Sequence, residues 1–240
     1  MPAQGPPVLS WSTVTTPGLV LGRLPRDPTV DRAVAAEAGV RVVRRSSGGG
    51  PVLWDAGLLS LDVALPAGHR LAPRDVVAAY RWLGEAIADA LRTLGVDDVE
   101  VIAVERAREA RRRPGPAQDA CFGGLSPYEV LAGGRKVVGL SQARRRQGAL
   151  VQAGVPLRLD PALLGRLLGR DDAFVDGLRA TAAGLEELAP ALDAAAVVGA
   201  VDAVLSASQG VALRDDVPSA AEREAIAAVT PDALAAGAGR

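Results

Sequence analysis

Two kinds of hydrophobic pattern divide the chain near residue 160, and this division constrains the fold more than any other feature. Before that point, short apolar segments alternate with turn-forming residues, as in a β-sheet. A helix is expected at residues 73–94, where apolar residues recur every three or four positions, and a charged loop at 105–116. We predict strands at residues 8–14, 18–22, 41–45, 51–54, 58–65, 99–104, 128–131, 136–140 and 149–159.

Helical periodicity dominates after residue 160. We predict helices at residues 161–168, 171–183, 194–208 and 219–229. Asp160-Pro161 and Thr230-Pro231 each place a capping residue before a proline that can begin a helix. The whole pattern predicts an α+β fold, in which a mixed β-sheet is flanked by helices and a short helical segment ends the chain.

The composition excludes several classes of protein. The 240 residues carry a net charge of −1, which argues against nucleic-acid binding. No apolar run is long enough for a membrane span, and no secretory signal is evident, so we expect a cytoplasmic protein. One cysteine and one histidine exclude an internal disulfide and four-ligand Cys/His zinc sites, and we expect no metal. Arginine runs at 111–113 and 144–146 are typical of solvated surface or of docking to an acidic partner.

A glycine-rich segment at residues 44–50 is the first candidate for chemistry. Three consecutive glycines destabilise regular structure but allow the backbone to approach a ligand closely. The flanking arginines and serines supply donors for a phosphate or a carboxylate. Trp54 follows the segment, and we expect either a core residue or the wall of a pocket there. The alternative is a flexible hairpin turn. The residues of the segment are Arg44, Arg45, Ser46, Ser47, Gly48, Gly49 and Gly50.

A lone lysine and a lone cysteine are the other candidates. Lys136 is the only lysine among 27 basic residues, and it follows a predicted Gly133-Gly134 turn at the start of a strand. Its ammonium group is suited to a carbonyl, carboxylate or phosphate, although a solvated lysine at a hairpin end is equally consistent with the pattern. Cys121 is either an inert apolar side chain or, beside a cation, a nucleophile.

These segments, in this order, resemble the lipoate–protein ligase and octanoyltransferase family, which is related to the biotin–protein ligases. Residues 42–55 are similar to the family's Arg-Arg-x-Ser/Thr-Gly-Gly-Gly motif, which lines an acyl pocket. Residues 134–142 are similar to its Gly-x-Lys-Ile/Val-x-Gly-Ser-Ala-Gln segment. The resemblance implies a catalytic domain at residues 1–160, with a helical segment at 161–240 packed on it. It also implies that Lys136 binds the acyl carbonyl, with substrate contacts from Arg45, Ser46, Ser47, Gly48, Gly49, Gly50, Trp54, Gly139, Ser141 and Gln142.

Within the family, Cys121-Phe122 with Tyr128-Glu129 resembles the cysteine-dependent octanoyltransferase branch. That resemblance implies that Cys121 accepts an octanoyl or lipoyl group as a thioester and passes it to a lysine of a lipoyl domain. An acyl carrier protein would be the donor, and a lipoyl domain or a glycine-cleavage H-type protein the acceptor. No cofactor is expected for this reaction, and we expect a monomer.

Two alternatives stay open at this stage. An ATP-dependent lipoate–protein ligase would use ATP and Mg²⁺, with Lys136 holding the carboxylate against the α-phosphate and Cys121 as a bystander. A catalytically weakened lipoyl-binding homologue is the other alternative. It is suggested by Ala153-Gly154-Val155, which stands where the family usually has His-Gly-Ser.

Overall fold

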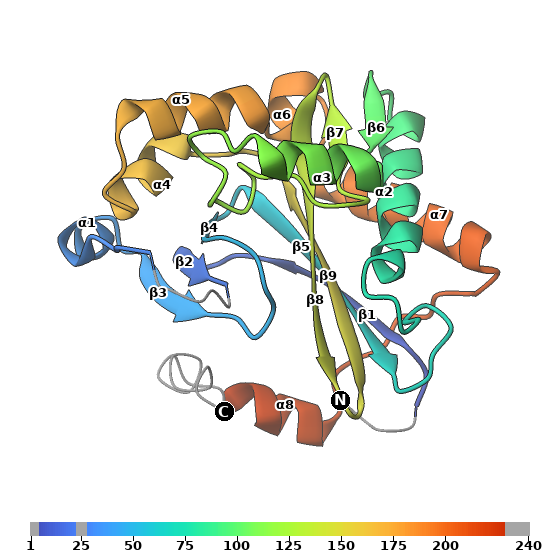
Figure 1. Cartoon of the computed structure of the whole chain (residues 1–240). Helices are drawn as coiled ribbons and strands as arrows, with labels where there is room; N and C mark the ends of the chain where they lie inside the picture. The colour runs from blue at the N-terminus through green and yellow to red at the C-terminus, as the bar shows by residue number, and fades with distance from the viewer. Residues whose placement is uncertain (1–4, 23–27, 229–240) are drawn as a thin grey trace.

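A large antiparallel sheet forms the core of the chain, which the computed structural model describes at residues 5–22 and 28–228 (Figure 1). Within those residues the sheet has six strands in the order β1-β5-β9-β8-β7-β6. Each strand is antiparallel to its neighbours. The strands are β1 (Val8–Thr13), β5 (Leu58–Pro66), β6 (Val99–Val101), β7 (Val130–Ala132), β8 (Arg135–Arg145) and β9 (Gly148–Pro156).

A smaller sheet lies against one face of the large one (Figure 1). Its described strands have the order β3-β2-β4, with bounds Arg41–Arg44, Gly18–Leu21 and Val52–Trp54. β2 pairs in parallel with β3 and antiparallel with β4. A short helix, α1 (Arg32–Glu37), precedes β3 and was not predicted. Its N-cap is Asp31, whose carboxylate accepts hydrogen bonds from the backbone N–H groups of Ala33 and Val34.

Two helices cover the opposite face of the large sheet. α2 (Arg81–Thr93) packs on α7 (Ala194–Gln209), and both contribute to the core that the strands complete. Alternate residues of β5 point into this core, as the period-two pattern predicts. The described core residues include Leu59, Leu61, Val63, Leu83, Ile87, Leu91, Val151, Val155, Val197, Val201 and Leu205, all 5% exposed or less.

A second core lies between the small sheet and the helices that follow β9. α4 (Pro161–Leu167) and α5 (Asp172–Thr181) contribute Leu164, Leu167, Phe174 and Leu178 to it. The predicted cap at Asp160 is confirmed, because its carboxylate accepts from the Leu163 N–H. α6 (Leu185–Leu188) and α8 (Ala220–Ala227) complete the described helices. Thr230-Pro231 lies outside the described residues.

Two sequence predictions were wrong in this region. The helix predicted from residue 73 begins at Arg81, after a 3₁₀ turn at Ala78–Tyr80. The Asp75 carboxylate accepts from the N–H groups of Val77 and Ala78, which holds the preceding backbone in a turn. The charged loop predicted at 105–116 is mostly helix α3 (Val104–Arg112).

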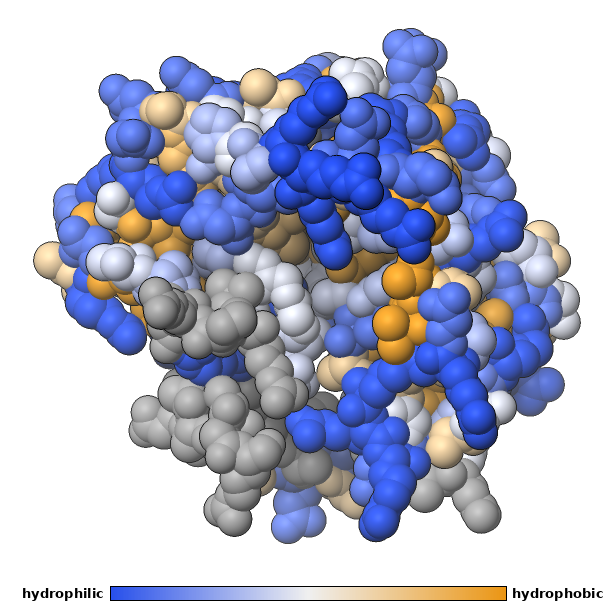
Figure 2. Space-filling model, viewed as in Figure 1, coloured by the Kyte–Doolittle hydropathy of each residue, from blue (hydrophilic) through white to orange (hydrophobic). Residues whose placement is uncertain are grey.

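Helix α3 forms because one face packs while the other is solvated. Ala107 is buried beside Ile102 and Leu131. Glu105 lies in the first turn and Arg111 and Arg112 in the last, as the helix dipole favours. Figure 2 shows a strongly hydrophilic surface over α3.

All nine predicted strand segments coincide with strands of the described chain, with ends shifted by a few residues. The Gly133-Gly134 turn is confirmed, since both residues have positive φ angles of 55° and 76° and join β7 to β8. The α+β fold class is therefore confirmed. In the part of the chain that the structure describes, no helix has both the length and the apolar character needed to cross a membrane.

Candidate active site

The face of the large sheet turned away from α2 and α7 carries small and polar residues. Gly139 of β8 pairs directly with Gly154 of β9, which pairs in turn with Ser60 of β5. Two residues along each strand, Ser141, Gln152 and Asp62 form a second row. Because the two glycines have no side chains, space is left above this part of the sheet. A pocket occupies it, lined by Arg45, Val52, Leu58, Ser60, Cys121, Phe122, Gly139, Leu140, Ser141, Gln152, Ala153 and Gly154.

A second pocket lies next to the first. The two share Val52, Leu58 and Phe122 as walls. The remaining walls of the second pocket are mostly apolar and come from β4 and its flanking residues, the β9–α4 connection, α4 and α5; they are Pro51, Leu53, Asp55, Arg158, Leu159, Asp160, Pro161, Leu164 and Leu178. An apolar chain that entered the first pocket would therefore find an apolar extension beyond Phe122.

Cys121 lies on the loop that joins α3 to β7, next to the glycine segment. Its N–H donates to the Pro51 carbonyl oxygen at 3.0 Å. Gly50 permits this close approach, because a Cβ there would overlap the carbonyl oxygen of Asp119. The thiol lines the first pocket, and a Cβ added at Gly139 would lie 3.6 Å from Sγ. The glycine segment and the cysteine therefore lie side by side.

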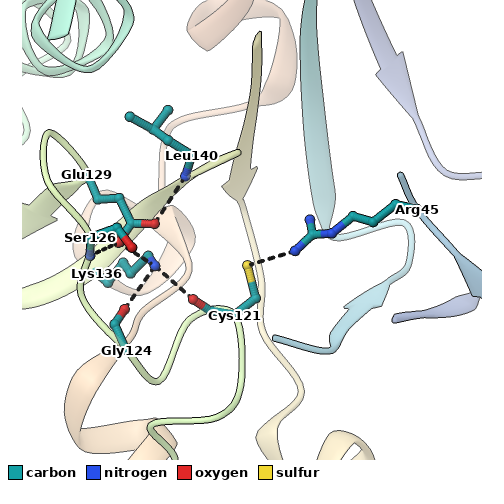
Figure 3. Close-up of polar contacts among 7 residues, drawn as sticks. All are labelled: Arg45, Cys121, Gly124, Ser126, Glu129, Lys136 and Leu140. Atoms are coloured by element: carbon teal, nitrogen blue, oxygen red, sulfur yellow. Dashed lines mark hydrogen bonds and ion pairs between the residues drawn. The ribbon is translucent and has the colours of Figure 1, made fainter. Parts of the chain in front are cut away.

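Arg45 is the cation nearest to the thiol in the described contacts. Its Nη2 lies 4.0 Å from Cys121 Sγ and donates to the Gly50 carbonyl oxygen at 3.3 Å (Figure 3). The Arg45 Nε is buried and has no hydrogen-bond partner among the described residues. A buried donor left unpaired beside a pocket is suited to an acceptor atom of a ligand.

Lys136 is buried behind the cysteine loop. Its side chain is 1% exposed, and its ammonium contacts three acceptors (Figure 3). It donates to the carbonyl oxygens of Cys121 at 2.7 Å and Gly124 at 3.0 Å, and pairs with a Glu129 oxygen at 2.7 Å. The ammonium also lies 5.5 Å from the centre of the Phe122 ring. Lys136 thus meets Cys121 through the peptide backbone, and it is not among the lining residues of either pocket.

Glu129 is the site residue to which the sequence analysis gave no role. It is 2% exposed, and burial raises the pKa of its carboxyl while the Lys136 ammonium lowers it. Its oxygens also accept from the N–H groups of Ser126 at 2.7 Å and Leu140 at 3.2 Å. The available signals were a single carboxylate directly before the apolar run from Val130 to Ala132, and the resemblance of Tyr128-Glu129 to the family's Tyr-Glu pair.

The other predicted site residues fall into two groups: some lie beside the pocket residues, and others point away from them. Ser47 is buried, and its hydroxyl accepts from the pocket residue Ser141 at 3.3 Å. Gly49 packs close to the Arg45 guanidinium, whereas a Cβ added at Gly48 would meet nothing within 4 Å. Ser46 is exposed, and the Gln142 amide donates to the Val76 carbonyl oxygen at the edge of the sheet.

Trp54 lines neither pocket. It pairs with Gly18 in the small sheet and packs on the second core, so the expectation that it forms a pocket wall is not met by the two pockets described above.

Comparison with known proteins identifies the family. Residues 2–206 match the lipoyl protein ligase A/B catalytic domain. The chain belongs to this family. Octanoyltransferase LipM from Exiguobacterium sibiricum is 35% identical over 191 residues, covering 76% of this chain and 68% of that protein. Octanoyltransferase LipM from Kyrpidia tusciae is 34% identical over 178 residues, covering 73% of this chain and 64% of that protein. The chain therefore spans about two thirds of the length of these relatives.

Solved structures agree with the fold. A lipoate–protein ligase A bound with ATP superposes with a TM-score of 0.70 and 20% identity, covering 93% of this chain and 81% of that chain. A bipartite lipoate protein ligase from Thermoplasma acidophilum gives a TM-score of 0.72 and 19% identity, covering 93% and 79%. The predicted lipoate–protein ligase fold of this family member is therefore confirmed.

Proposed function

We propose that this chain transfers an octanoyl or lipoyl group to a lysine of a lipoyl domain through a Cys121 thioester. An octanoylated acyl carrier protein is the proposed donor, and a lipoyl domain or a glycine-cleavage H-type protein the acceptor. The octanoyltransferase relatives support this reaction class. The observation that carries the proposal is the position of the only cysteine in the pocket, beside the guanidinium of Arg45.

The first step forms an acyl-enzyme. The Cys121 thiolate attacks the carbonyl carbon of the donor thioester, the new C–S bond forms, and the bond to the carrier sulfur breaks. The carrier thiolate leaves and takes up a proton. Arg45 is suited to stabilise both the attacking thiolate and the oxyanion, since its Nη2 faces Sγ and its Nε is unpaired.

The second step releases the product. The ε-amine of the acceptor lysine attacks the Cys121 thioester, an amide forms, and the amine proton passes to the departing Cys121 sulfur. Neither step needs a nucleotide, so we propose no cofactor. The acyl chain would lie in the first pocket and extend past Phe122 toward the apolar second pocket.

Lys136 supplies positive charge close to the Cys121 carbonyl in this proposal. Its direct contact with an acyl carbonyl stays a prediction. Since its ammonium already has three protein acceptors, such a contact would require one of them to be released.

The test is transfer without ATP. The protein is incubated with octanoylated carrier and a lipoyl domain, and both proteins are weighed by mass spectrometry. We expect an octanoylated domain and an octanoyl adduct on Cys121, and Cys121→Ala should abolish both. Product formed only from free acid and ATP would support a ligase instead. Retained lipoyl-domain binding without transfer by either route would support a binding homologue.

A further inference from the structure

The Glu129 carboxylate connects three parts of the site (Figure 3). One oxygen pairs with Lys136 at 2.7 Å and accepts from the Ser126 N–H at 2.7 Å, on the loop that follows Cys121. The other accepts from the N–H of Leu140, a wall of the first pocket, at 3.2 Å. The pairing of β7 with β8 shifts register at Val130 and Leu131. This irregularity lies next to Glu129 in the chain.

The backbone before Glu129 is held in an unfavourable conformation. Tyr128 has a φ angle of 66°, which is unusual for a bulky residue. Its N–H donates to the Ile102 carbonyl oxygen, and the Ile102 N–H donates to the Glu129 carbonyl oxygen. Gly84 of α2 leaves room for the Tyr128 carbonyl group, with which a Cβ would overlap. Several elements therefore hold the Glu129 backbone in place.

Lys136 connects Glu129 to the cysteine. The ammonium donates to the carbonyl oxygens at both ends of the segment from Cys121 to Gly124. On its other side, Cys121 donates its N–H to the carbonyl oxygen of Pro51, the residue that follows the glycine segment. The Cys121 backbone is thus held at its N–H and at its C=O, and this arrangement directs the thiol toward Arg45.

We propose that Glu129 is a positioning residue that holds Cys121 beside Arg45 by way of Lys136. A fully buried ammonium is costly unless a counter-charge is present, and Glu129 is the only carboxylate paired with Lys136 in the described residues. Without the Glu129 carboxylate, the buried Lys136 ammonium has no counter-charge and moves away. Its hydrogen bonds to the carbonyl oxygens of Cys121 and Gly124, which hold the cysteine segment, are then lost. This inference rests on the proposed function, since it assigns Glu129 to the Cys121 thioester reaction.

The experiment compares Glu129→Gln with the wild-type protein and with Glu85→Gln. Glu85 is an exposed carboxylate paired with Arg81, so the control makes the same chemical change outside the site. Two rates are measured: formation of the octanoyl adduct on Cys121, and alkylation of Cys121 by iodoacetamide as a function of pH. Because the chain has one cysteine, alkylation reports on that thiol alone.

For Glu129→Gln we expect adduct formation to slow by roughly 10²-fold, as for a small misplacement of a reacting group. We also expect the alkylation profile to move to higher pH, because the thiol loses its position beside Arg45. Glu85→Gln should match the wild type. Wild-type adduct formation in Glu129→Gln would overturn the proposal, as would an alkylation profile that is unchanged or moves to lower pH.

A second set of variants tests whether Glu129 acts through Lys136. If it does, Glu129→Gln should slow the reaction little further in a Lys136→Met background, and additive losses would overturn the proposal. If Glu129→Gln does not fold, the double variant Glu129→Leu, Lys136→Met is used in its place. Removing both charges of a buried ion pair destabilises a protein less than removing one of them. That double variant should fold and acylate slowly, with alkylation shifted to higher pH, and wild-type rates in it would contradict the proposal.

Failure of the proposed function is separable from failure of this inference. If wild-type protein forms no octanoyl adduct, the transferase proposal fails. The alkylation profiles still report whether Glu129 positions the thiol.

Discussion

The guanidinium of Arg45 lies against the thiol of Cys121, with Nη2 4.0 Å from Sγ, although the two residues are 76 positions apart. A cation next to a thiol favours the thiolate, which is the nucleophilic form. The contact therefore gives Arg45 an electrostatic role at the thiol.

Substitutions of Arg45 should show how much its charge and its planar geometry each contribute to the reaction of Cys121. We expect Arg45→Met to slow octanoyl-adduct formation about 10²–10³-fold and to move the alkylation of Cys121 to higher pH. Arg45→Lys should lie between, since an ammonium keeps the charge but lacks the planar guanidinium whose Nη2 contacts both Gly50 and the thiol. Arg41→Met, at an exposed position of β3, the strand that precedes Arg45, is the control. Equal rates for Arg45→Met and wild type would remove Arg45 from the mechanism.

The glycine segment offers a matched pair of substitutions. A Cβ at Gly50 would overlap the Asp119 carbonyl oxygen, whereas a Cβ at Gly48 would meet nothing within 4 Å. We expect Gly50→Ala to push the cysteine loop away and to lower the free energy of unfolding by about 1–3 kcal/mol. Gly48→Ala should leave that free energy within about 0.5 kcal/mol of wild type. Urea unfolding measures both. Similar losses for the two variants would contradict the described packing of the loop on the segment.

Much of the fold could be predicted because strands depend on local patterns. The alternation in β5 and the Gly133-Gly134 turn can be predicted without tertiary information, and both are observed. Helix α3 was missed because its arginine-rich sequence has one small buried residue, Ala107, which packs with Ile102 and with Leu131 of β7.

The site was predictable in its parts but not in its contacts. The glycine segment, the lone cysteine and the lone lysine are unusual in composition, so each could be singled out. Which cation faces the thiol depends on how two loops meet, and local sequence patterns do not show that. The structure pairs Arg45 with the thiol and Lys136 with the backbone of the same residue.

Phe122 separates the two pockets, and its size should therefore influence the acyl chain that is accepted. We expect Phe122→Ala to join the pockets and to shift the preference from octanoyl toward longer acyl groups. The ratio of the two acylation rates should change by about tenfold or more, which is the discrimination that one methylene gives in an apolar pocket. The variant should also lose about 3–5 kcal/mol of stability, so assays belong well below its unfolding temperature. Adduct formation with octanoyl, decanoyl and dodecanoyl carriers measures the preference. An unchanged order of rates would mean that the chain does not pass Phe122.

Asp62 should make stability depend on pH. It lies beside Gln152 on the pocket face of the sheet, and burial raises the pKa of its carboxyl, partly opposed by the hydrogen bond from Gln152. A raised pKa means that the folded state binds a proton more readily than the unfolded state. Stability from this group is therefore present at low pH and is lost as the pH rises through the folded-state pKa. Asp62→Asn stays neutral and can still accept from Gln152, so we expect it to melt above the wild type near pH 7.

The advantage of Asp62→Asn should shrink toward about pH 3.5, where the wild-type carboxyl is mostly protonated in both states. Thermal unfolding of both proteins at the two pH values measures this change, and Asp97→Asn, at an exposed position before β6, provides the baseline for removing a surface charge. A melting difference between Asp62→Asn and wild type that is independent of pH, or that grows toward acid, would show that folding does not disfavour ionisation of Asp62. In that case the polar row of Asp62, Gln152 and Ser141 stabilises the charged carboxylate, and the pocket face is more polar than its burial indicates.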